Sequence, residues 1–66
     1  MQITVNGKPR DLGTAADLAA LLRQLGLDPT RVAVERNLTI VPQTQFGATA
    51  LAEGDRLEIV QFVGGG

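Results

Sequence analysis

The chain has 66 residues and a mass of 6.9 kDa, enough for one small domain that buries only about 60% of its surface on folding. It contains no cysteine and no histidine, which excludes disulfides, iron–sulfur clusters and the usual zinc sites. Hydrophobic residues make up 44% of the chain, aromatic residues 3%, and the net charge is −1. We therefore expect a globular protein without the basic, aromatic-rich surface that binds nucleic acid.

The same composition argues against an enzyme that acts alone. Without His or Cys there is no ordinary nucleophile–base pair, and the seven carboxylates show no spacing that favours acid–base catalysis.

The longest apolar run, residues 18–22, is far too short to span a membrane. Met1 leads into a strand-like segment and not into a signal peptide. We expect a cytoplasmic protein without a membrane segment.

The first predicted element is a β-hairpin. Ile3 and Val5 alternate with polar residues, as in a half-buried strand. Asn6-Gly7 is typical of a type I′ turn, because both central residues of that turn need positive φ. Residues 8–12 form the predicted return strand. Since Pro9 cannot donate a ladder hydrogen bond, we expect this strand at the edge of the sheet.

A stripe of leucines predicts the one helix. The leucines recur with the period of a single buried helical face, at Leu18, Leu21, Leu22 and Leu25. We expect Thr14 to cap the N-terminus of the helix, with Asp17 three residues on as a variant of the capping box. Gly26 suits the left-handed residue after the last turn, which allows Leu27 to pack back on Leu22.

The second half of the chain predicts three further strands, at residues 32–34, 38–41 and 56–63. Turns are expected at residues 35–37, where Asn37 can adopt positive φ, and at residues 53–55. Residues 43–51 follow neither period, and we expect them to wrap the surface with Phe46 as their anchor. Because one helix covers only one face of a sheet, these elements predict an α+β domain of two layers.

The glycines Gly64-Gly65-Gly66 follow the last predicted strand directly. They lack the polar spacer of a flexible linker, although a frayed end is the alternative interpretation. Glycine passes through slots too narrow for other residues, and three extended residues reach about 10 Å. We therefore interpret residues 64–66 as a flexible tail that carries the Gly66 carboxylate into a partner's active site. Activation of that carboxylate as an acyl adenylate requires ATP machinery on the partner, because the chain has no phosphate-binding loop.

The last predicted strand suggests a docking surface beside the tail. Leu57 and Ile59 share one face by the period of two, which places Val60 and Phe62 on the other. Two alternatives stay open for Val60 and Phe62. They are either exposed, as suits a partner interface, or turned into the core by a bulge. The predicted partner-binding residues are Val60, Phe62, Val63, Gly64 and Gly65.

Several segments match one known family: the hairpin start at Asn6-Gly7, residues 34–37 (VERN), 40–42 (IVP), 53–55 (EGD) and 58–66 (EIVQFVGGG). Through them the whole chain resembles the thiamine-biosynthesis sulfur carrier family (ThiS), which has the ubiquitin-like β-grasp fold. The resemblance implies a single sulfur carrier domain over residues 1–66, with a mixed sheet of four to five strands packed on one helix. Some relatives carry Ala in place of Gly64, a change that leaves Gly65-Gly66 intact.

The resemblance also implies a mechanism and three partners. An adenylyltransferase of the ubiquitin-activating type (ThiF) uses ATP and magnesium to adenylate the Gly66 carboxylate. A cysteine desulfurase system supplies persulfide sulfur and converts Gly66 to a thiocarboxylate. Thiazole synthase (ThiG) then takes this sulfur into the thiazole ring. The chain is thus expected to be a co-substrate that binds no cofactor or metal itself.

Three alternatives remain open from the sequence. A molybdopterin-synthase-type sulfur carrier has the same fold and tail but is usually longer. The second is a ubiquitin-like protein modifier. Because Lys8 is the sole lysine, copies of such a modifier can be linked to one another through a side chain in only one way. The third is a β-grasp module that binds a ligand or RNA, and the charge and the few aromatic residues argue against RNA.

Overall fold

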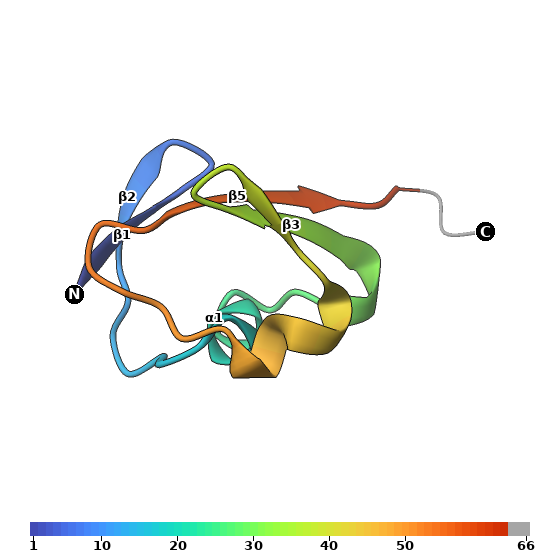
Figure 1. The fold of residues 1–66 in the computed structure, drawn as a ribbon, viewed down its shortest axis with the longest axis horizontal. Helices are drawn as coiled ribbons and strands as arrows, with labels where there is room; N and C mark the ends of the chain where they lie inside the picture. Colours follow the sequence, from blue (N-terminus) through green and yellow to red (C-terminus); the bar gives the residue numbers. More distant parts are fainter. Residues whose placement is uncertain (64–66) are drawn as a thin grey trace.

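The computed structural model describes residues 1–63, in which a mixed five-stranded sheet lies over one α-helix (Figure 1). The strands are β1 (Gln2–Val5), β2 (Lys8–Asp11), β3 (Val32–Arg36), β4 (Thr39–Val41) and β5 (Arg56–Gln61), and the helix is α1 (Leu18–Gln24). Their order in the sheet is β2-β1-β5-β3-β4. β5 runs parallel to β1 and antiparallel to β3. The predicted α+β fold, with a mixed sheet packed on one helix, is confirmed.

The N-terminal hairpin forms as predicted. Asn6 and Gly7 have φ angles of 51° and 80°, the values that a type I′ turn requires. β2 lies at the edge of the sheet, which explains how Pro9 is accommodated without a backbone N–H.

The start of α1 differs from the prediction. Asp17, and not Thr14, is the N-cap, and its Oδ1 accepts a hydrogen bond of 2.8 Å from the N–H of Ala20. The reason is tertiary, because Asp17 is extended and forms an isolated β-bridge with Ala50. That pairing holds the preceding residues out of the helix. Leu25 follows the last helical residue as the C-cap, and it is half-buried and packs against the core as the stripe predicts.

The helix ends as the sequence predicts. Gly26 has a φ of 74°, and its N–H donates to the carbonyl of Arg23 at 3.0 Å. The N–H of Leu27 donates to the carbonyl of Leu22 at 2.9 Å. These two bonds form a Schellman motif, which satisfies carbonyls of the last turn.

The hydrophobic core lies between α1 and the inner face of the sheet. Leu18, Leu21 and Leu22 are completely buried, and burial of each leucine side chain contributes about 1.5–3 kcal/mol. They pack with inward-facing strand residues, namely Ile3, Val32, Val34, Leu57 and Ile59.

Phe46 is buried as predicted, but residues 43–51 are not irregular throughout. They contain a 3₁₀-helix, η2 (Gln43–Ala48), and a second one, η1 (Pro29–Arg31), precedes β3.

The hairpin after β3 is shifted from its predicted position. Glu35 and Arg36 were assigned to the turn, yet both belong to β3 and pair with β5. The turn consists of Asn37 and Leu38, with φ angles of 51° and 71°. β3 is longer than predicted because its residues pair with the central strand β5, and a local sequence pattern does not reveal such distant pairing.

In residues 1–63, α1 is too short to reach across a lipid bilayer.

Candidate functional site at the end of β5

β5 is the central strand that leads to the predicted tail (Figure 1). It pairs with β3 from Arg36 opposite Leu57 to Val32 opposite Gln61. Beyond the strand, the N–H of Phe62 donates to the carbonyl of Arg31 at 2.8 Å. The chain is therefore held by β3 up to Gln61 and by Arg31, the residue before β3, at Phe62.

On the side of β1, the backbone pairing of β5 ends earlier. β1 ends at Val5, and the last backbone bond on this side joins the N–H of Asn6 to the carbonyl of Leu57 at 2.8 Å. The Asn6 side chain then continues the ladder. Its Nδ2 donates to the carbonyl of Ile59 at 3.1 Å, and its Oδ1 accepts from the N–H of Ile59 at 2.7 Å. A side-chain amide has the same donor and acceptor as a peptide group, so Asn6 replaces a further residue of β1.

A second side-chain cluster holds the beginning of β5. Asp55 is 5% exposed, and its Oδ2 accepts hydrogen bonds from Arg36 Nε at 2.9 Å and from the N–H of Ala52 at 2.8 Å. Its Oδ1 accepts from Asn37 Nδ2 at 3.1 Å. Asn37 Oδ1 in turn accepts from the N–H of Arg56 at 2.9 Å. This cluster ties the β3–β4 hairpin to the turn before β5.

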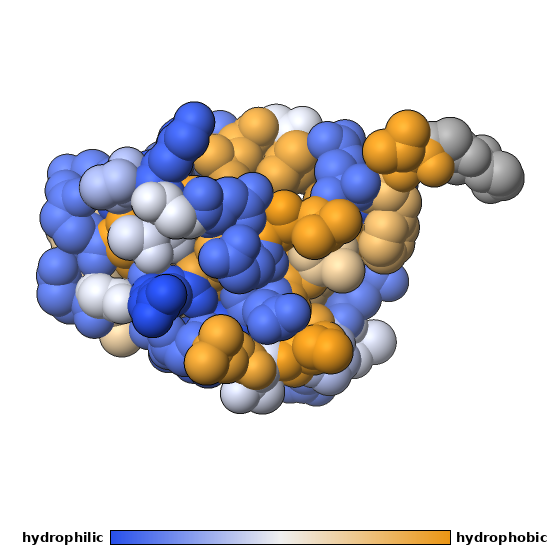
Figure 2. Space-filling view, turned by 90° about the horizontal axis from the view of Figure 1, so that it is seen from above, coloured by the Kyte–Doolittle hydropathy of each residue, from blue (hydrophilic) through white to orange (hydrophobic). Residues whose placement is uncertain are grey.

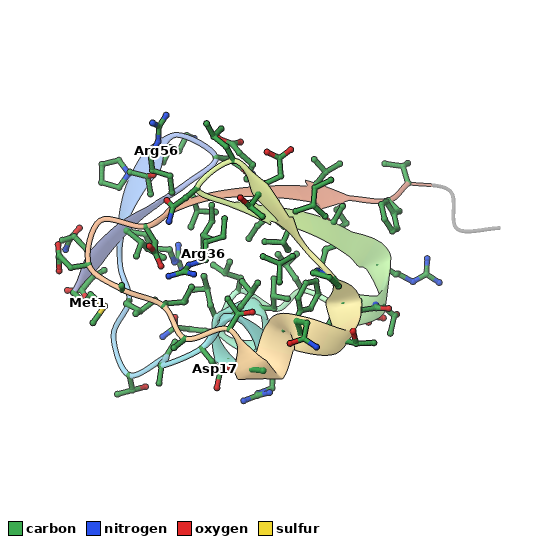
Figure 3. The ribbon with its side chains drawn as sticks, viewed as in Figure 1. Met1, Asp17, Arg36 and Arg56 are labelled. Carbon is green, nitrogen blue, oxygen red and sulfur yellow. The ribbon has the colours of Figure 1, made fainter. Side chains whose placement is uncertain are left out.

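Two opposing effects set the charge state of Asp55. Burial by itself raises the pKa of this carboxyl, but the hydrogen bonds from Arg36, Ala52 and Asn37 together hold the pKa below its ordinary value. Figure 3 shows Arg36 beneath the sheet, on the side of α1, and Arg56 on the opposite side. The ion pair therefore lies on the α1 side of the sheet, with Asp55 buried and the Arg36 side chain 32% exposed.

The sequence predicts only turns at Asn6 and at residues 53–55. It does not predict that Asn6 and Asp55 fix β5. A signal existed for Asn6, because an asparagine in a type I′ turn adds a peptide-like side chain to its tolerance of positive φ. No local signal distinguished Asp55 from an ordinary turn residue.

The two alternatives for Val60 and Phe62 are now decided. The register between β3 and β5 runs without interruption, so no bulge turns these side chains inward. Val60 is 61% exposed and Phe62 53%, and the next residue, Val63, is 94% exposed. Figure 2 shows hydrophobic side chains on this face of the sheet, which lies opposite α1, and at the end of the described chain. Gly64, Gly65 and Gly66 lie outside the described residues.

The part of the chain that the structure describes offers no group of three or more carboxylate side chains that could hold a metal ion. What remains at this site is an exposed apolar segment on a rigidly held strand. Such an arrangement can present a chain segment to another protein.

Comparison with known proteins identifies the family. The model of the ThiS family matches residues 3–66. The chain belongs to the ThiS family. Over 66 residues it is 47% identical to a thiazole synthase of Paramagnetospirillum magneticum and 44% identical to one of Magnetococcus marinus. The chain is covered completely in both cases but spans only 20% of the length of each of these relatives.

Two relatives match over nearly their full length. The sulfur carrier protein ThiS of Bacillus subtilis is 38% identical over 68 residues, which cover 97% of this chain and 98% of that protein. The crystal structure of a thiamine biosynthesis protein (ThiS) from Geobacter metallireducens superimposes with a TM-score of 0.83 at 36% identity, with both chains fully covered. The expected family and the β-grasp fold are therefore confirmed.

Proposed function

We propose that this ThiS-family chain is a sulfur carrier of thiamine biosynthesis and not itself an enzyme. The observation that carries the proposal is the match to a sulfur carrier protein of Bacillus subtilis over 98% of that protein's length. The fold supports it, because β5 ends in an exposed segment directly before Gly64-Gly65-Gly66. We place the carrier in the cytoplasm, where ATP and reduced thiols are available.

The proposed chemistry takes place at the Gly66 carboxylate. A carboxylate resists attack because oxide is a very poor leaving group. Reaction with ATP on an adenylyltransferase of the ThiF type forms the acyl adenylate and releases pyrophosphate. The terminal sulfur of a persulfide on a cysteine desulfurase system then attacks the acyl carbon, and AMP leaves. A thiol cleaves the resulting acyl disulfide, which leaves the Gly66 thiocarboxylate and a disulfide on the partner.

The residues before Gly66 have a proposed binding role. Val63 is 94% exposed, and Val60 and Phe62 are more than half exposed, so a partner can bury all three side chains. Because β3 and Asn6 hold β5 in place, little conformational freedom is lost up to Phe62 on binding. Gly64 and Gly65 fit a narrow channel, since a residue without a side chain approaches other backbones closely.

Thiazole synthase is the proposed acceptor of the sulfur. Two relatives named thiazole synthase contain a segment similar to the whole of this chain. The presence of both parts in one polypeptide raises their effective concentration, which suits a carrier that hands its sulfur to that enzyme.

Mass spectrometry tests the proposal. After incubation with the adenylyltransferase, ATP, magnesium and a persulfide source, the intact mass should rise by the difference between one sulfur and one oxygen atom. A variant that lacks Gly66 should show no increase. Addition of thiazole synthase and its other substrates should return the mass to its original value. An unchanged mass under conditions that load the Bacillus subtilis carrier would contradict the proposal.

A further inference from the structure

The pairing between β1 and β5 is short, and Asn6 ends it. β1 pairs with β5 over two residue pairs, the second of which is Val5 opposite Leu57. The chain then turns into the first hairpin, so the backbone of β1 does not reach the second half of β5. Asn6 donates the last backbone bond of this pairing, to the carbonyl of Leu57, and its side-chain amide makes both bonds to Ile59 beyond it.

Beyond Ile59, the side of β5 that faces β1 is open. Backbone groups of a strand point alternately to its two neighbours. The N–H of Phe62 donates to the carbonyl of Arg31 on the β3 side, so the backbone N–H and C=O of Gln61 point to the β1 side. Within residues 1–63, no side chain or loop bonds to Gln61 there. The Asn6 amide is thus the last hydrogen-bonded restraint on this side of the described chain.

The side chains with a proposed binding role are held from the other side. Val60 lies opposite Ala33 in β3, and Phe62 is bonded to Arg31. Both keep these partners whether or not the Asn6 amide is present. Loss of the amide instead leaves the second half of β5 with β3 as its one hydrogen-bonded neighbour among the described strands. The direction in which the chain leaves the sheet is then less well fixed relative to β1.

We propose that Asn6 is a positioning residue for the adenylation of Gly66. The inference rests on the proposed function, because it concerns the first step of that chemistry. A Gly66 carboxylate oxygen attacks the α-phosphorus of ATP, the bond between the α-phosphorus and the bridging oxygen breaks, and pyrophosphate leaves with the electron pair. Asn6 touches none of these atoms. It acts through Ile59, whose N–H and carbonyl it holds, and a misplacement of about 1 Å costs such a step about 100-fold in rate.

The second hairpin supplies a matched control at the other end of β5. Asn37 has the same φ of 51° as Asn6, and its amide also makes two hydrogen bonds, to Asp55 and from the N–H of Arg56. These bonds hold the beginning of β5, which lies far along the strand from Gln61. Glycine keeps the positive φ of either turn and removes the amide. Asn6→Gly and Asn37→Gly therefore make the same chemical change at opposite ends of one strand.

Single-turnover adenylation of the full-length chain tests the proposal. Each chain is mixed with an excess of the adenylyltransferase, ATP and magnesium, and pyrophosphate release is followed at increasing enzyme concentrations. Asn6→Gly should lower the rate constant at saturating enzyme by about tenfold or more. The enzyme concentration for half-saturation should change far less, because β3 still holds Val60 and Phe62. Asn37→Gly should show the rate constant of the wild type within about twofold.

Circular dichroism first establishes that each variant is folded under the assay conditions. If Asn6→Gly does not fold, Asn6→Asp takes its place, because aspartate tolerates the same φ and lacks only the donor to the Ile59 carbonyl. The expected decrease in the saturating rate constant then applies to Asn6→Asp.

Three results overturn the proposal. The first is a saturating rate constant of the Asn6 variant equal to that of the wild type. The second is an equal decrease in Asn37→Gly, because general loosening of β5 would then explain both. The third is a change confined to the half-saturating concentration, which would assign Asn6 to binding. A wild type that releases no pyrophosphate, under conditions that adenylate the Bacillus subtilis carrier, defeats the proposed function itself. A normally adenylated wild type beside an equally fast Asn6 variant defeats only the positioning role.

Discussion

Asn6 shows how one residue serves both the turn and the end of the sheet. Its φ of 51° starts the first hairpin, and its amide exchanges two hydrogen bonds with Ile59. The second interaction lies on the strand that leads to the tail, so the position of the site depends on a side chain more than fifty positions earlier in the chain.

Asn6→Asp separates these two roles. Aspartate tolerates the same φ, but a carboxylate cannot donate to the Ile59 carbonyl. We expect a loss of about 1–3 kcal/mol in the free energy of unfolding at neutral pH, measured by urea denaturation. Protonation of the new carboxyl restores a donor, so the difference from the wild type should narrow near pH 3. A difference that is absent, or equal at both pH values, would refute this role of Asn6.

Asp55 should make the stability of the protein depend on pH in the acid range. Its folded-state pKa lies below the ordinary value, so its stabilising contribution is present above the unfolded pKa and disappears as the pH falls through the folded pKa. We expect urea unfolding to require less denaturant as the pH is lowered below about 5.

Asp55→Asn should remove much of this dependence. The change should destabilise the protein at neutral pH by about 1–3 kcal/mol, because a neutral amide weakens the hydrogen bonds that the carboxylate accepts from Arg36 and Ala52. The control is Asp28→Asn. The pKa of Asp28 is lowered by hydrogen bonds from Thr30, but its side chain is exposed, and solvent screens such interactions. An equal loss of pH dependence in both variants would contradict the role of the Asp55 cluster.

At the scale of elements, β5 connects the core to the proposed binding residues. Leu57 and Ile59 are buried, whereas Val60 is largely exposed. Alternate residues of one strand thus either pack in the core or face outward. β3 supports this division, because it pairs with β5 along its whole length.

Phe62→Asp and Leu57→Ala test this division. Phe62→Asp should weaken binding to the adenylyltransferase and leave the urea midpoint nearly unchanged, because the side chain is 53% exposed. Leu57→Ala should lower the free energy of unfolding by about 2–5 kcal/mol through the cavity it leaves. Circular dichroism and isothermal titration distinguish the two effects. Unfolding of the Phe62→Asp protein would show that Phe62 belongs to the core after all.

At the scale of the whole molecule, one sheet combines a buried face, which packs on α1, with an exposed face on the opposite side (Figures 1 and 2). Much of this architecture was predictable. The order of the elements, the edge position of β2 and the inward leucines follow from turn residues, proline and hydrophobic period. The predictions that were wrong, at Thr14, Glu35 and Arg36, concern the ends of elements. There a distant strand or bridge competed with the local preference.

The amino-acid sequence by itself determined the features that depend on near neighbours. These are the turn at Asn6-Gly7, the buried helical face and the left-handed Gly26, since φ preferences and helical period act within a few residues. Only the tertiary structure decided that Val60 and Phe62 face outward and that Asp17 caps the helix. It also decided which groups hold β5, because Arg36 and Asp55 are 19 positions apart and Asn6 and Ile59 are 53 apart. No local rule specifies which distant backbone or side chain such a polar group meets until the strands have paired.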